Sequence, residues 1–205
     1  MNDFATELWS RTWQQLQRAT VHKRHPFGVG TLITNHLYQF GENQQELAPR
    51  SRTVVLRRVD LAARELLAYT DVRSFKAKDI LAGRNFVSWC FWNPKSNVQF
   101  TCVGVAKIIT GPAARQRYME LPKHSRKAYA TRSAPGSNQP TAGDGLPDDW
   151  ENRECEETDY AAENFAFLTT TVLQAEILQL SREGHRRIRG QLLENGSWDL
   201  TNITP

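Results

Sequence analysis

The sequence predicts an α+β protein built on an antiparallel β-barrel of six to eight strands, with helices at its periphery. Three observations favour this fold. Short apolar or alternating segments follow one another closely between residues 31 and 109. There is no repeating strand–helix unit and no glycine-rich GxGxxG or GxxxxGK(S/T) motif, which argues against a doubly wound parallel sheet. The chain ends in two alternating segments joined by Asn195-Gly196, the strongest short-range hairpin signal.

Length and composition limit the class of protein. The 205 residues suffice for one well-cored domain, and we expect a single domain over residues 1–205. No apolar run approaches the ~20 residues that cross a bilayer, and residues 1–13 lack a basic-then-apolar signal pattern. We therefore expect a cytoplasmic protein that does not bind membranes. The three cysteines lack CxxC spacing and the five histidines lack paired ligand spacing, so neither a disulfide framework nor a metal site is predicted.

Taken in order, the elements begin with a helix over about residues 3–19. Its apolar side chains recur at steps of three and four residues, and we expect the stripe they form to pack on the barrel. They are Phe4, Leu8, Trp9, Trp13 and Leu16. Strands are predicted over 31–40, 52–59 and 65–71, and residues 41–49 are expected to form a loop.

The rest of the chain mixes short strands and helices. We predict a helix over 74–83, strands over 85–92 and 98–109, a helix over 112–130, one or two strands over 164–180 and the hairpin over 186–203. Ser74 is a favoured N-cap, and Gly83 is a favoured residue at a helix end. Pro112 suits the start of the longer helix, which Pro122 interrupts.

Residues 133–160 are predicted to form a long, partly mobile surface loop. Its first part is rich in proline, glycine, serine and asparagine, and residues 144–159 are strongly acidic. Because the whole chain carries a net charge of +4, the remaining residues are more basic than the total implies. We interpret the loop as a solvated segment without chemistry of its own.

The segment RTVVLRRVD, residues 52–60, places cations at both ends of an apolar strand. Strict alternation would put Arg52 and Arg58 on one face of the strand and Arg57 on the other. Arginine keeps its charge in proteins, so these side chains either extend past the core into water or hold an anionic ligand. This segment alone leaves both possibilities open.

A second cationic element follows about twenty residues later. The segment RSFK, residues 73–76, lies where a strand ends and a helix begins. Free backbone N–H groups at a helix N-terminus bind phosphate readily, and Ser74 and Lys76 stand beside them. Tyr69 and Thr70 add hydroxyl groups at the end of the preceding strand. Neighbouring strands would bring both cationic elements to one anion, and the pattern favours a ligand that carries a phosphate.

From about residue 50 onward, the order of motifs resembles the pyridoxamine 5'-phosphate oxidase family of FMN-binding split barrels. RTVVLRRVD is similar to the family's Arg-x-Val-Leu-Leu-Lys strand, and AYTDVRSFKAKDI is similar to its Phe-Tyr-Thr-Asn…Ser-Arg-Lys-Ala segment. VQFTCVGVAKII resembles the Arg-Gln-Val-x-Val-x-Gly strand. The end, QAEILQL…HRRIR…GSWDLTNITP, resembles the closing Ile-Glu-Phe-Trp-Gln…Arg…Trp…Leu-x-Pro pattern. Each motif alone is weak, whereas the four in order at similar spacing are moderately specific.

The resemblance implies a homodimer with FMN between the subunits and a small-molecule substrate. Arg52 and Lys76 would pair with the phosphate, and Arg57 would stabilise the negative charge that develops on the ring. Which of the two arginines of the C-terminal hairpin reaches the flavin stays open, because the spacing slips there. The residues assigned to FMN are Arg52, Thr53, Val54, Val55, Leu56, Arg57, Tyr69, Thr70, Ser74, Lys76, Gln99, Arg187 and Arg189.

The chain also departs from the family pattern. Phe75 replaces an arginine that helps to hold the phosphate, a loss for which Arg73 could compensate, and Leu178 replaces a tryptophan at the flavin site. We therefore expect a divergent relative of the oxidase rather than the housekeeping enzyme. The substrate-binding residues of the oxidase are matched only loosely, by Tyr118, Arg126 and His185.

Two classes of function remain. The first is an FMN-dependent oxidoreductase that transfers a hydride between a small substrate and FMN, with pyridoxamine or pyridoxine 5'-phosphate oxidation as a special case. No catalytic side chain is predicted, because the flavin itself accepts the hydride. The second is a non-catalytic protein that binds or stores flavin. Nucleic-acid binding is disfavoured, because the basic cluster at 182–189 has only Trp198 as an aromatic neighbour on its hairpin.

Overall fold

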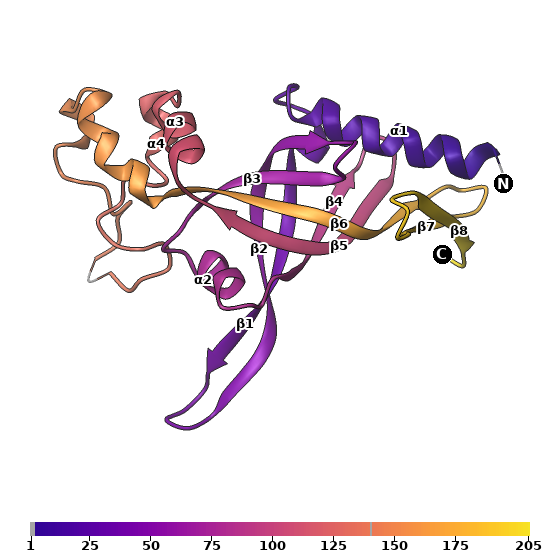
Figure 1. Ribbon diagram of the computed structural model, residues 1–205, viewed down its shortest axis with the longest axis horizontal. Coiled ribbons are helices and arrows are strands. Elements are labelled where there is room, and N and C mark those ends of the chain that lie inside the picture. The colour runs from indigo at the N-terminus through magenta and orange to yellow at the C-terminus, as the bar shows by residue number, and fades with distance from the viewer. Residues whose placement is uncertain (1–2, 140) are drawn as a thin grey trace.

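The computed structural model describes residues 3–139 and 141–205 (Figure 1). Within these residues, one eight-stranded sheet has the order β3-β2-β1-β4-β5-β6-β7-β8, and an additional pairing of β3 with β6 closes the first six strands into a ring. This arrangement confirms the predicted antiparallel barrel. The strands are β1 Val29–Gln39, β2 Gln45–Asp60, β3 Glu65–Asp71, β4 Phe86–Asn93, β5 Val98–Ile109, β6 Phe165–Gln179, β7 Arg186–Leu192 and β8 Trp198–Ile203. The helices are α1 Asp3–Ala19, η1 Pro26–Gly28, α2 Phe75–Leu81, α3 Pro112–Met119, α4 Lys123–Arg126, η2 Trp150–Asn152 and η3 Glu156–Asn164.

The long strand β6 belongs to two parts of the sheet. Residues 165–171 pair with β3, and residues 174–179 pair with β7. β5 pairs with both halves across a bulge beside Gly104. A Cβ atom at Gly104 would lie 2.2 Å from the carbonyl oxygen of Thr171, so only glycine fits where β6 changes its neighbour. The barrel is therefore split, and β7 and β8 extend the sheet beyond the closed ring.

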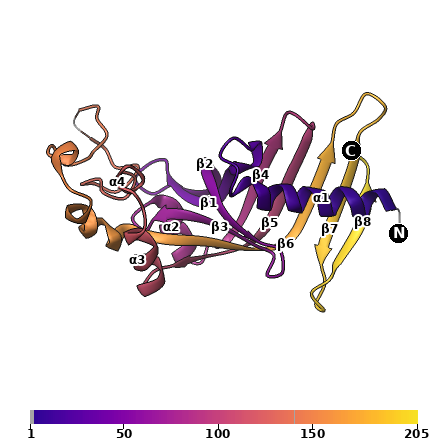
Figure 2. The same cartoon turned by 90° about the horizontal axis from the view of Figure 1, so that it is seen from above.

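Helix α1 covers the sheet at the end where β7 and β8 lie (Figure 2). Trp9 contacts Trp198 of β8 edge-on with 5.1 Å between the ring centroids, and Trp13 contacts Phe100 of β5 edge-on at 5.2 Å. Both tryptophans of the helix are buried. The apolar stripe of the helix therefore supplies one wall of the main core. No helix in the described part of the chain is long and apolar enough to cross a membrane.

A second core lies at the other end of the molecule, around α3, α4 and η3 (Figure 1). Tyr118 and Phe165 are fully buried there, and Trp150 of η2 joins them with 2% of its surface exposed. The predicted break at Pro122 is present, since Pro122 is the N-cap that separates α4 from α3. The helices therefore build a small apolar cluster beside the barrel.

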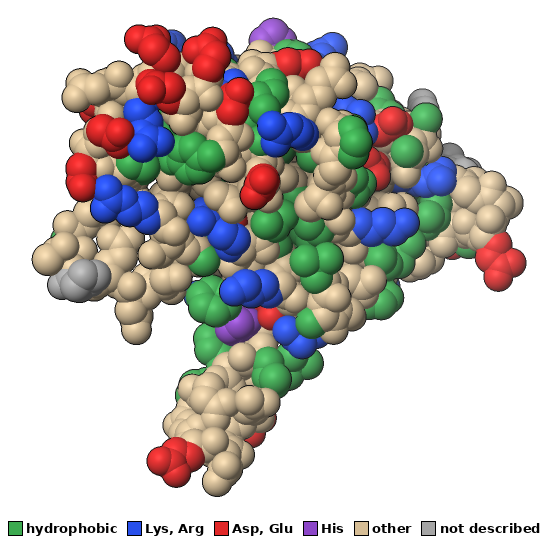
Figure 3. Space-filling view, turned by 60° about the vertical axis from the view of Figure 1, so that its left-hand side comes forward, with side chains coloured by type: hydrophobic (Ala, Val, Ile, Leu, Met, Phe, Trp, Pro, Cys, Tyr) green, Lys and Arg blue, Asp and Glu red, His purple; other side chains and the backbone are tan. Residues whose placement is uncertain are grey.

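Residues 41–49 do not form the predicted loop throughout. β2 begins at Gln45, and its first residues pair with the end of β1, from Gln39 opposite Gln45 onward. The resulting hairpin projects away from the body (Figures 1 and 3). Both faces of such an arm contact solvent, so its strand carries no alternation of polar and apolar residues that a sequence pattern could reveal.

The acidic segment 133–160 is also more ordered than predicted. Leu146, Trp150 and Thr158 are buried, and the helices η2 and η3 occupy its second half. Some of its carboxylates nevertheless face outward, since the side chains of Asp148 and Glu151 are 92% and 80% exposed. Figure 3 shows acidic side chains gathered at this end of the molecule. The segment is therefore a charged outer layer with an apolar inner face that belongs to the second core.

Candidate functional site

The strand β2 carries the first group of candidate residues, and a bulge changes which face they occupy. Leu56 pairs with Ala68 of β3, but Arg58 pairs with its neighbour Leu67, so Arg57 is an extra residue in the ladder. After the bulge Val59 is buried, and Arg58 faces solvent beside Glu65 at 3.3 Å. The prediction that Arg52 and Arg58 share a face is therefore wrong, because it assumed strict alternation along the strand.

Before the bulge, the inward positions of β2 end in a cationic cavity. Arg52 lies on the inward side of the strand, and Lys76 of α2 reaches the same place from the next connection along the chain. The cavity measures about 280 Å³. Its principal lining residues are Arg50, Arg52, Ser74, Phe75 and Lys76, and Pro135 and Gly136 of the acidic segment close one side. The structure thus brings together the two cationic elements that the sequence analysis places on neighbouring strands.

The cations of this cavity lack neutralising partners. Among the ion pairs of residues 3–139 and 141–205, none involves Arg50, Arg52 or Lys76. Within the described part of the chain, the ammonium group of Lys76 donates to Ser74 Oγ alone, at 3.3 Å. Burial and the charge of Arg52 lower the pKa of Lys76 to about 8, against the opposing effect of Asp71. Burial, followed by the charge of Arg50, also lowers the pKa of Arg52. An anion in the cavity would relieve this repulsion.

The neighbouring hydroxyl groups support the cavity to different degrees. Ser74 lines it and donates its Oγ hydrogen to the carbonyl oxygen of Asp71 at 2.7 Å, rather than capping α2. Thr70 is buried behind Ser74, with 3.4 Å between the two hydroxyl oxygens. Arg73 is turned away, because it pairs with Asp71 at 2.7 Å and donates to the carbonyl oxygen of Thr131 at 3.0 Å. The suggestion that Arg73 takes over from an arginine at position 75 therefore does not fit its contacts.

A second cavity of about 380 Å³ opens on the outer side of the bulge. Arg57 lies over the ring of Tyr69, with its guanidinium carbon 5.2 Å from the centroid. Arg117 of α3 donates to the Tyr69 hydroxyl at 2.6 Å, and Phe167 and Thr169 of β6 form another wall. This cavity combines an aromatic surface with three guanidinium groups, those of Arg57, Arg58 and Arg117, and with the carboxylate of Glu65.

The apolar stretch between the two cavities divides its side chains between inside and outside. Val54 and Leu56 pack into the main core, whereas Thr53 and Val55 are exposed. The outer side chains of Thr53 and Val55 are therefore the part of this stretch that faces solvent.

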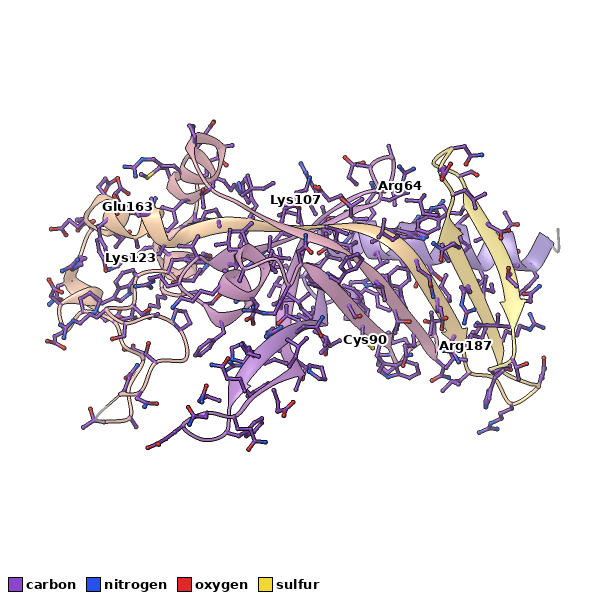
Figure 4. The ribbon with its side chains drawn as sticks, turned by 60° about the horizontal axis from the view of Figure 1, so that its bottom comes forward. Arg64, Cys90, Lys107, Lys123, Glu163 and Arg187 are labelled. Carbon is purple, nitrogen blue, oxygen red and sulfur yellow. The ribbon has the colours of Figure 1, made fainter. Side chains whose placement is uncertain are left out.

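The other candidate cofactor residues lie on a different part of the sheet. Gln99 of β5 and Arg187 of β7 occupy one row, since both are cross-strand partners of Leu178. Arg187 and Arg189 donate to Glu176, at distances down to 2.6 and 2.8 Å. Burial opposes ionisation of Glu176, but the hydrogen bonds from the two arginines outweigh it and lower the pKa of its carboxyl. Figure 4 shows Arg187 at one end of the molecule, far from Lys123 and Glu163 at the other.

Two of the three candidate substrate residues are built into the second core. Tyr118 is fully buried and donates to the carbonyl oxygen of Thr158 at 2.9 Å. Arg126 is 3% exposed, and it donates to Asp159 at 2.7 Å and to backbone carbonyl groups around it. His185 lies in the exposed turn before β7. The structure does not bring these three side chains to one place.

Three residues beside the cavities are not predicted by any pattern in the sequence. His36 and Asp79 lie behind the cationic cavity, with 2.9 Å between His36 Nδ1 and the carboxylate, but 43 residues separate them in the chain. Arg117 adjoins the predicted Tyr118 but points the other way, toward Tyr69. Only the fold brings such residues to a site, because no fixed spacing links them.

Comparison with known proteins identifies the fold and the family of this chain. The fold is shared with a pyridoxamine 5'-phosphate oxidase-related, FMN binding protein of Nostoc punctiforme, at a TM-score of 0.74 and 20% identity, over 96% of this chain and 97% of that one. It is also shared with PhzG of Burkholderia lata 383, solved in complex with tetrahydrophenazine-1-carboxylic acid, at a TM-score of 0.67 and 15% identity, over 98% and 92% of the two chains. No curated protein matches the sequence significantly. The family model described as "Pyridoxamine 5'-phosphate oxidase, FMN-binding domain" matches residues 7–110, half of the chain. The chain therefore belongs to the pyridoxamine 5'-phosphate oxidase FMN-binding domain family.

Proposed function

We propose that this protein binds FMN and acts as an oxidoreductase that transfers a hydride between a small substrate and the flavin. The observation that carries the proposal is the cationic cavity of Arg52 and Lys76, which contains no neutralising carboxylate among the described residues. The family binds FMN. The phosphate of FMN carries the negative charge that this cavity lacks, and its size suits the cavity. The flavin, when bound, supplies the site that accepts or donates the hydride.

The residues around the cavity suit a phosphate ester. Arg52 and Lys76 would each donate to phosphate oxygens, while Ser74 accepts from Lys76 and has Thr70 behind it. The exposed side chains of Thr53 and Val55 lie along the strand between this cavity and the second one, where Arg57 and Tyr69 would meet the polar edge of the ring. A fixed guanidinium there stabilises negative charge that develops during hydride transfer, because it needs no reorganisation at that moment.

We further propose that the complete site requires two copies of the chain. Gln99, Arg187 and Arg189 lie on β5 and β7, whereas the cationic cavity is lined by β2, the start of α2 and residues 135–136. A single flavin contacting both groups is most simply held between a chain and its dimer partner. Such a dimer would place the C-terminal hairpin of one subunit over the cavity of the other. We expect the protein to work in the cytoplasm.

The burial of Tyr118 and Arg126 bears on the substrate. A guanidinium that already donates to Asp159 and to surrounding carbonyl groups has few donors left for a substrate phosphate. This favours a substrate other than pyridoxine 5'-phosphate over the housekeeping reaction. The same observation supports the second candidate function, a non-catalytic flavin-binding protein, since cofactor residues are retained while substrate residues serve the core.

The test begins with the absorbance spectrum of the purified protein and identification of any released cofactor. We expect flavin bands and FMN, or stoichiometric uptake of FMN by colourless protein on titration. Anaerobic bleaching of the bound flavin by members of a panel of amines, alcohols and reduced cyclic carboxylates would support the oxidoreductase. Stable colour across the panel would support the flavin-binding protein, and failure to take up FMN would refute both.

A further inference from the structure

Arg50 is a third cation at the cationic cavity, and contacts on two sides fix its position. Its guanidinium carbon lies 4.3 Å above the centroid of the Phe75 ring. Its Nη1 atom is 3.3 Å from Nε2 of His36 on β1. The side chain lies on the cavity lining beside Arg52 and Lys76. A stacked guanidinium keeps its edge N–H groups free, so hydrogen bonding to an anion remains available to it.

His36 is in turn held by a buried carboxylate. The distances from its Nδ1 atom to the two carboxylate oxygens of Asp79 are 3.0 and 2.9 Å, and Asp79 is 2% exposed. A carboxylate beside Nδ1 places the proton of a neutral imidazole on that nitrogen, which leaves Nε2 as the acceptor that faces Arg50. The His36 ring also meets Phe75 edge-on at 5.1 Å. Asp79, His36 and Phe75 together therefore fix where the Arg50 guanidinium points.

This arrangement orients Arg50 without neutralising it. A neutral imidazole contributes no charge, and Asp79 already pairs with Arg84 at 2.9 Å. Three cations consequently converge on one cavity, a situation that costs free energy unless an anion of more than one charge binds there. A phosphate monoester carries about two negative charges at neutral pH.

We propose that Arg50 is a third ligand of the FMN phosphate and that His36, backed by Asp79, is its positioning residue. This inference rests on the proposed function, because it assumes that the cavity receives the phosphate of FMN. Arg50 would complete a three-cation grip with Arg52 and Lys76. His36 would not contact the ligand and would act only through the direction it gives to Arg50.

The first test compares FMN with riboflavin, which lacks the phosphate, by titrating flavin-free protein and following flavin fluorescence. Arg50→Gln should weaken FMN binding about tenfold or more and leave riboflavin binding within about threefold. Lys76→Met should lower FMN affinity similarly. Lys78→Met removes a charge from the exposed face of the same helix and should change the affinity for neither flavin. If Lys76→Met weakens FMN binding and Arg50→Gln does not, the role of Arg50 is refuted while the proposed function stands. If neither variant changes the affinity for FMN relative to that for riboflavin, the assignment of this cavity to the phosphate is wrong.

The second test separates positioning from simple structural support. His36→Leu removes the acceptor at Arg50 and should weaken FMN binding, but it should add nothing in the Arg50→Gln background. His36→Gln can keep an acceptor for Arg50 and should restore most of the affinity. Thermal unfolding of each variant checks that the fold persists, and the Arg50→Gln comparison remains decisive if His36→Leu does not fold. If His36→Leu lowers FMN affinity equally in the native and Arg50→Gln backgrounds, the histidine does not act through the arginine.

Discussion

The guanidinium group of Arg126 donates a hydrogen bond of 2.7 Å to the carboxylate of Asp159 and is 97% removed from solvent, since only 3% of the side chain is exposed. It also donates to the backbone carbonyl oxygens of Met119, Leu121 and Cys155. These contacts connect α3, α4 and η3 through one side chain. Arg126 is therefore a central element of the second core.

The first prediction is that Arg126→Met destabilises the protein. The variant leaves buried carbonyl oxygens without donors, so the free energy of unfolding should fall by about 3 kcal/mol. Chemical denaturation measures the loss. Arg132→Met is the matched control, because Arg132 pairs with Asp148 at the surface and both side chains are exposed; it should leave stability almost unchanged. Native stability in Arg126→Met, combined with loss of a substrate-dependent activity, would instead assign Arg126 to the substrate.

The second prediction concerns the cost of burying Lys76. Its pKa of about 8 in the folded protein is below the usual value of 10.5 for an unperturbed lysine. A base with a lowered folded pKa reduces stability at every pH below that pKa, and the cost disappears as the pH rises through the unfolded value. Lys76→Met should therefore stabilise flavin-free protein by about 2 kcal/mol at pH 7, and by progressively less above pH ~8. A destabilised variant at pH 7 would contradict this.

The third prediction is a pH dependence of FMN affinity. Bound phosphate favours the charged form of Lys76, so FMN should bind best where the lysine is protonated before binding. Affinity should fall as the pH rises above about 8, by at most about tenfold per pH unit, while riboflavin affinity stays flat. Lys76→Arg keeps its charge over this range and should abolish the slope. A slope that persists in Lys76→Arg would assign the titration to another group.

The fourth prediction tests whether two chains share each flavin site. Arg52→Glu and the double variant Arg187→Glu/Arg189→Glu should each bind little FMN alone. A mixed dimer, purified through two different affinity tags after co-expression, has one site with both changes and one site with neither. It should therefore bind one FMN per dimer, half the amount of the native dimer. Absence of FMN from the purified mixed dimer would show that both groups of residues serve the same chain. Normal FMN binding by Arg187→Glu/Arg189→Glu alone would show that the C-terminal arginines are not ligands.

Several features of the fold follow directly from the sequence. The apolar stripe of α1 predicts its packing, and Asn195-Gly196 predicts the β7–β8 hairpin, because both signals depend only on local spacing. The convergence of Arg52 and Lys76 was also predictable, since two short connections leave little choice about which strands are neighbours. These are inferences from local pattern and short loops.

Other features depend on tertiary contacts that no local pattern contains. The bulge at Arg57 reverses the faces of Arg58 and Val59, yet a bulged strand and a regular one can have the same composition. Arg126 resembles any exposed arginine on a short helix, and its burial arises from the later segment 155–159 folding over it. His36 reaches Asp79 only because α2 packs on β1.

The central claim is that Arg52 and its cationic neighbours hold the phosphate of FMN. The most direct measurement is the pair of dissociation constants for FMN and riboflavin, in native protein and in Arg52→Glu. We predict that native protein prefers FMN by about a hundredfold or more, and that the charge reversal removes this preference while riboflavin binding is retained. Equal affinities for the two flavins in native protein, or unchanged FMN affinity in a folded Arg52→Glu variant, would contradict the account.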